Sequence, residues 1–118
     1  MDLRLSDIPG LAIERATNSL LDTVGVTLPG LEEPATRIAV QLAASDNAAP
    51  GASVIGGAMK TATEWAAFVN GIAGHALDYD DVSYAVIGHR SVVVLPAVLA
   101  VAAATGASGE SALLAYAR

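Results

Sequence analysis

Both histidines of this 118-residue chain lie in one short polar stretch. Residues 70–91 read NGIAGHALDYDDVSYAVIGHRS, and they contain His75 and His89 together with three aspartates. Histidine gains and loses a proton near neutral pH, and a neighbouring carboxylate can act as the second acid or base. The stretch therefore predicts acid/base chemistry, with Asp78 and His89 as the catalytic pair.

Other polar side chains near this pair are predicted to bind the substrate. On a helix of 3.6 residues per turn, His75 and Asp78 sit within about 60° of each other, so they can line one wall. The full set of predicted substrate-binding residues is Asn70, His75, Asp81, Ser83, Arg90 and Ser91.

Simpler structural roles remain open for several of these residues. Asp80 and Asp81 can each be loop carboxylates that cap the next element. His75 can be a core histidine bonded to a backbone carbonyl group, and Arg90 can either meet a substrate carboxylate or remain in solvent.

Metal and phosphate chemistry are weaker interpretations of the same residues. His75, Asp78, Asp81 and His89 are acceptable ligand types, but their spacing matches no zinc or calcium pattern. The segment IGGAMKT lacks the spacer of a phosphate-binding loop, and the D-x-D-D shape of DYDD is too short to be specific. We therefore predict no metal and no cofactor.

Composition excludes several other classes of function. The formal net charge is −6 and no cluster of Lys or Arg is present, which argues against binding to nucleic acid or to an anionic membrane surface. The longest apolar run, residues 92–104, is shorter than the ~20 residues of a membrane span and contains Pro96. With no cysteine and no signal-peptide pattern, a cytoplasmic location is expected.

The apolar periodicity and the turn residues predict an all-α fold of about five helices. A short extended segment near residues 52–56 is expected between the second and third helices, where β-branched residues precede two glycines. The expected helices run from Pro9 to about Pro29, from Pro34 to about Ala44, from Ala62 to about Leu77, from about Ser91 to Gly106, and from Ser108 onward.

Local signals also predict caps and buried faces. Ser6 or Asp7 is expected to cap the first helix, and Thr61 with Glu64 is expected to form a capping box for the third. The residues expected to face the core are Leu11, Ala16, Leu20, Leu21 and Val24 in the first helix, and Ile38, Leu42 and the neighbouring alanines in the second. The last helix has no C-terminal capping signal before Arg118, so we expect the chain to be a fragment.

Four blocks of sequence resemble, in the same order, the opening blocks of the MmgE/PrpD family. They are LLDTVGVTLPG at 20–30, VNGIAGHALDYDD at 69–81, GHRS at 88–91 and LPAVLAVAAATGASGESALLAY at 95–116. This family includes 2-methylcitrate dehydratase, cis-aconitate decarboxylase and an iminodisuccinate epimerase. The resemblance covers most of the chain and identifies it as the N-terminal portion of a family member.

The resemblance implies a two-domain, dimeric lyase that acts on small tricarboxylates without a metal cluster. Residues 1–118 would then be a partial helical domain, and the smaller α+β domain would be absent. The implied function is dehydration of 2-methylcitrate in propionate catabolism. Alternatives are a decarboxylase or epimerase of the same family, or a non-catalytic helical interaction module or gene remnant. The isolated chain is expected to be inactive.

The resemblance also assigns roles to individual residues. The first aspartate of the family motif falls on Asp78 and the family histidine falls on His89, and both are implied to be catalytic. Two departures affect the pocket. Where the family usually has threonine after the paired aspartates this chain has Val82 and then Ser83, and the family proline after the histidine is Arg90.

Overall fold

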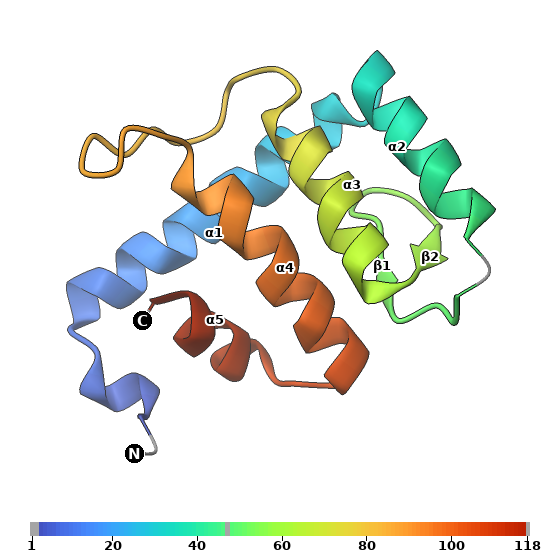
Figure 1. The fold of residues 1–118 in the computed structure, drawn as a ribbon. Helices are drawn as coiled ribbons and strands as arrows, with labels where there is room; N and C mark the ends of the chain where they lie inside the picture. Colours follow the sequence, from blue (N-terminus) through green and yellow to red (C-terminus); the bar gives the residue numbers. More distant parts are fainter. Residues whose placement is uncertain (1–2, 47, 118) are drawn as a thin grey trace.

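A computed structural model describes residues 3–46 and 48–117, and these residues are mostly helical (Figure 1). A short 3₁₀ turn, η1 (Leu5–Asp7), comes before the first α-helix. The α-helices in the described residues are α1 (Gly10–Gly30), α2 (Pro34–Ser45), α3 (Thr63–His75), α4 (Arg90–Thr105) and α5 (Gly109–Ala117). The predicted all-α fold with about five helices is confirmed.

The expected extended segment forms one edge of a small hairpin. Strand β1 (Ala52–Ser53) pairs antiparallel with β2 (Lys60–Thr61), with Ala52 opposite Thr61. Residues 1–2, 47 and 118 lie outside the described part of the chain. Arg118, before which no C-terminal capping signal was found, is among them.

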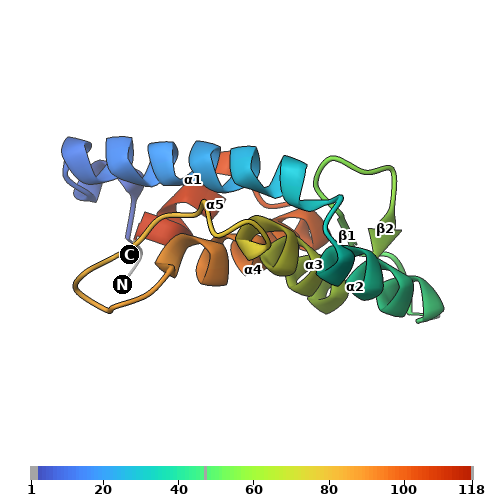
Figure 2. The same cartoon turned by 90° about the horizontal axis from the view of Figure 1, so that it is seen from above.

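The helices form two layers. In Figure 2, α1 lies along one side while α3, α4 and α5 lie beneath it, with α2 at one end. Helices α3 and α4 lie side by side and are both in contact with α1. This arrangement brings the end of α3 and the start of α4 close together, which is where the polar stretch connects them.

Two glycines allow the close approach of these helices. A Cβ atom on Gly74 of α3 would lie 2.6 Å from Cγ2 of Val92 in α4 and 3.2 Å from the Thr27 hydroxyl of α1. A Cβ on Gly30 would overlap the carbonyl oxygen of Ala73. Such contacts require a side chain no larger than hydrogen, so these glycines set the distance between the two layers.

The predicted inward faces of α1 and α2 are partly wrong. Ile38 and Leu42 are 59% and 50% exposed, whereas Ala39 and Ala43 are buried as expected. In α1, Ala16 is buried and Leu20 and Val24 are half-buried, but Leu11 and Leu21 are exposed. The helices pack so closely that alanine, glycine and threonine occupy the contacts, and longer side chains lie outside them.

The predicted caps at the N-termini of α1 and α3 are also wrong. Pro9 is the N-cap of α1 and no side chain caps this helix. The Asp7 carboxylate instead accepts a 2.8 Å hydrogen bond from the backbone N–H of Arg4, the N-cap of η1. Thr61 belongs to β2, and its hydroxyl donates to the Ala43 carbonyl at 3.5 Å. Helix α3 therefore begins at Thr63 rather than Ala62, and it ends at His75 rather than Leu77.

The predicted signals around α4 and α5 are confirmed. Gly106 ends α4 with φ 67°, a left-handed conformation that glycine adopts without strain. The Ser108 hydroxyl accepts a 3.1 Å hydrogen bond from the backbone N–H of Ser111, as an N-cap residue does. Pro96 lies inside α4. In the described residues, no helix is long and apolar enough to cross a membrane.

Candidate active site

The polar stretch forms a loop that turns two histidines toward one another. His75 is the last residue of α3 and His89 is the N-cap of α4. Asp78 follows the helix end with φ 55°, and Asp tolerates this left-handed conformation better than most residues. Ser83 pairs with Gly88 in an isolated antiparallel bridge, which closes the loop on itself before His89. The loop therefore returns the chain to the end of α3.

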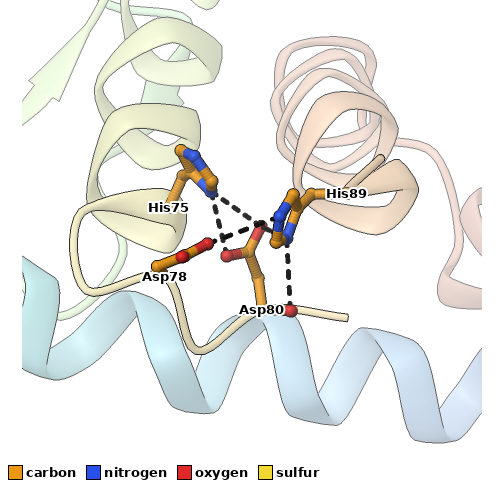
Figure 3. Close-up of side chains that lie close together, drawn as sticks. All are labelled: His75, Asp78, Asp80 and His89. Atoms are coloured by element: carbon orange, nitrogen blue, oxygen red, sulfur yellow. Dashed lines mark hydrogen bonds and ion pairs between the residues drawn. The ribbon is translucent and has the colours of Figure 1, made fainter. Parts of the chain in front are cut away.

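Four side chains meet at this point, and we call them the His–Asp cluster: His75, Asp78, Asp80 and His89 (Figure 3). The rings of His75 and His89 lie edge to face, with centroids 4.7 Å apart and planes at 63°. One ligand-type atom from each of the four residues lies within 4.8 Å of all the others. The two ends of the polar stretch thus form a single group.

Asp80 joins the two histidines. Its Oδ1 lies 3.0 Å from Nδ1 of His75, and its Oδ2 lies 3.2 Å from Nδ1 of His89. Carboxylate and carbonyl oxygens only accept hydrogen bonds, so Nδ1 of each imidazole is the donor. Nδ1 of His75 donates to the Asp80 carboxylate, whereas Nδ1 of His89 donates to the Asp80 backbone carbonyl at 3.3 Å and has the carboxylate beside it. The Asp80 side chain is 1% exposed. A buried carboxylate needs such partners, and here both come from the cluster.

His89 lies between two carboxylates. Its Nδ1 contacts Asp80, and its Nε2 lies 3.4 Å from Oδ1 of Asp78. A ring with protons on both nitrogens would donate to both aspartates. The Asp78 side chain is 75% exposed and that of His89 is 26% exposed, so a small molecule can reach this contact.

An open cavity of ≈ 980 Å³ lies beside the cluster, between α3 and α4. His75, Asp78 and His89 contribute its polar groups, while the other lining residues are apolar or small, among them Phe68, Ile72 and Val93. No Lys or Arg of the described chain lines it. The cavity thus offers proton-transfer groups but no cation for an anionic ligand.

Asp81 and Ser91 are placed together on the side of α4 that faces α5. The Ser91 backbone N–H donates to Oδ1 of Asp81 at 3.1 Å, and the Ser91 hydroxyl donates to Oδ2 at 2.6 Å. The same hydroxyl lies 2.6 Å from that of Tyr116 in α5. A carboxylate at a helix N-terminus interacts favourably with the helix dipole. Asp81 therefore anchors the loop to α4 and positions His89.

The remaining predicted substrate-binding residues do not line the cavity. Both ends of the buried Asn70 amide bind the hairpin segment: its oxygen accepts from the Ile55 N–H at 2.9 Å and its nitrogen donates to the Ser53 carbonyl at 3.2 Å. Ser83 lies in the loop bridge. Arg90 lines a separate hollow against α1. Of the eight predicted site residues, the structure brings three to the cavity: His75, Asp78 and His89.

Asp80 is the cluster residue that was not among the predicted site residues. Its neighbours Asp78 and Asp81 share its chemistry, and nothing local indicates which carboxylate becomes buried.

A comparison with protein families assigns the chain. The model of the MmgE/PrpD N-terminal domain matches residues 1–118. The chain belongs to the MmgE/PrpD family. The resemblance found in the four sequence blocks is therefore confirmed, and the helical structure agrees with it. No curated protein sequence matches the chain significantly.

Proposed function

We propose that this MmgE/PrpD domain contributes the acid/base groups of a lyase that acts on a small tricarboxylate, with dehydration of 2-methylcitrate as the reaction. The observation that supports this proposal is the contact between Asp78 and His89 at the mouth of the cavity, with Asp80 behind it. The same groups would serve a decarboxylase or an epimerase of the family.

The proposed dehydration needs two proton transfers. Asp78 takes a proton from the carbon beside a carboxylate, and the electrons of the broken C–H bond form the C=C bond. Protonated His89 gives its Nε2 proton to the departing hydroxyl, which leaves as water. The 3.4 Å contact then lets Asp78 return its proton to His89 and complete the cycle.

The charge of the cavity sets a further requirement. A tricarboxylate needs positioned cations, and none of the described residues that line the cavity is Lys or Arg. We therefore propose that the cations come from outside this domain, from a second domain or from the partner subunit of a dimer. The chain alone is expected to be inactive for this reason.

A substrate panel tests the proposal. The chain and any longer protein that its gene encodes would be incubated with 2-methylcitrate, cis-aconitate and iminodisuccinate, and the products would be identified by mass spectrometry. Loss of water from 2-methylcitrate by the longer protein, abolished in Asp78→Asn, supports dehydration. Loss of CO₂ from cis-aconitate, or epimerisation of iminodisuccinate, would replace that assignment. Full activity of Asp78→Asn would contradict the role of the cluster.

A further inference from the structure

The His–Asp cluster combines ligand types that suit a transition-metal ion. Imidazole nitrogen and carboxylate oxygen are both ligands of Zn²⁺, with bonds of about 2.0–2.2 Å. Each residue of the cluster offers one such atom, and none of the atoms is more than 4.8 Å from another. Two of the four residues are the two histidines of the chain.

Two distances within the cluster are close to those of a tetrahedral site. Nδ1 of His75 and Nδ1 of His89 each lie 3.2 Å from the same oxygen, Oδ2 of Asp80. Ligand atoms around a tetrahedral ion with such bonds are about 3.3–3.5 Å apart. Two of the three donor pairs therefore already have about the spacing that the ion requires.

Charge and burial favour a cation at this position. The Asp80 side chain is 1% exposed, and its contacts with the described residues are those to the two imidazoles. Asp78 adds a second carboxylate, and no Lys or Arg of the described chain lines the neighbouring cavity. With both histidines neutral the cluster carries two negative charges, which a divalent ion would balance.

Asp78 differs from the other three residues in its exposure. Its side chain is 75% exposed, and it reaches the cluster through the contact with Nε2 of His89 rather than through Asp80. It can complete the tetrahedron if its side chain turns from Nε2 of His89 toward Asp80, or it can leave the fourth position to water, as in zinc sites with an open position.

We infer that His75, Asp80 and His89 bind one Zn²⁺-like divalent metal ion, with Asp78 or water as the fourth ligand. The ion takes the place of the protons on the two Nδ1 atoms. If the proposed function is correct, the bound ion occupies the acid/base pair and inhibits the reaction. That consequence rests on the proposed function, whereas binding itself does not.

The test is a calorimetric titration of the chain with ZnCl₂ near neutral pH. The expected result is one ion per chain and an affinity that falls about tenfold or more in His75→Gln, Asp80→Asn and His89→Gln. The control, Asp22→Asn, makes the same chemical change as Asp80→Asn on the exposed surface of α1 and should leave the affinity unchanged.

Folding and geometry are tested separately. Circular dichroism shows whether each variant folds, and His75→Gln is the decisive one because the His75 side chain is 53% exposed and its replacement leaves the core intact. Co²⁺ in place of Zn²⁺ should give the intense visible absorption of a tetrahedral site. Absence of saturable 1:1 binding, or unchanged affinity in folded His75→Gln, would overturn the inference. Either result leaves the turnover assay of the proposed function unaffected.

Discussion

His75 is held by Asp80 although more than half of its side chain is open to solvent. Its Nδ1 lies 3.0 Å from the buried Oδ1 of Asp80, and the side chains are 53% and 1% exposed. One partner is thus anchored in the protein and the other faces the cavity. This contrast means that substitutions on the two sides of the same hydrogen bond should have different consequences.

Asp80→Asn should destabilise the fold. The amide nitrogen that replaces one carboxylate oxygen donates instead of accepting, so Nδ1 of His75 loses one of its two buried acceptors and the charge on the other. We expect a loss of about 1–3 kcal/mol in the free energy of unfolding, measured with urea. Asp22→Asn is the matched control. Equal stability of the two variants would show that Asp80 does not hold the histidines.

His75→Gln should leave stability nearly unchanged and impair the site. Glutamine keeps polarity and approximate size, and its side-chain amide can donate to the buried Asp80 carboxylate in place of Nδ1. We expect a change below about 0.5 kcal/mol in unfolding free energy, as for most surface substitutions, together with weaker ligand binding. A large loss of stability with unchanged affinity would instead make His75 a core histidine.

Asp78→Asn and His89→Gln should each lower kcat by about 10² or more in a longer enzyme that contains this domain. Each change removes one of the two proton-transfer groups, while both replacements keep the shape of the side chain. Steady-state kinetics on the substrate identified in the panel would measure the loss. A kcat near that of the unmodified enzyme would return the residue concerned to a structural role.

Asn70→Ala should act on stability rather than on the substrate. Both hydrogen bonds of the buried amide go to the segment of β1 and the turn after it, so their loss leaves backbone groups of Ser53 and Ile55 without partners. We expect a cost of about 1–3 kcal/mol and an unchanged KM. Asn18→Ala, exposed on α1, is the control. A raised KM at unchanged stability would support the predicted substrate contact.

Gly74→Ala should separate α3 from α4 and so disturb the cluster between them. The added methyl group would meet Val92 at 2.6 Å, and overpacking of this kind costs about 1–3 kcal/mol. Gly25→Ala is the matched control, since nothing lies within 4 Å of its added methyl group. Because alanine favours a helix more than glycine does, this substitution should stabilise α1 by up to about 1 kcal/mol. Thermal unfolding of the two variants should shift in opposite directions.

Local sequence signals were sufficient for the helices and for some of their ends. Pro34 in the first turn of α2, Gly106 after α4 and Ser108 before α5 act through their own backbone conformation or a hydrogen bond to a residue nearby in sequence. Such effects depend little on the rest of the fold.

Tertiary packing decided what the local pattern left open. Ile38 and Leu42 have the periodicity of a buried face, yet the closeness of the helices leaves space only for Ala39 and Ala43. Thr61 has the spacing of a capping residue, but strand pairing with Ala52 removes it from the helix. Three aspartates of the same chemistry lie close together in the loop, and Asp80 is the one that is buried against both histidines. It has this place because the loop returns His89 to the end of α3. That return depends on contacts between residues distant in sequence.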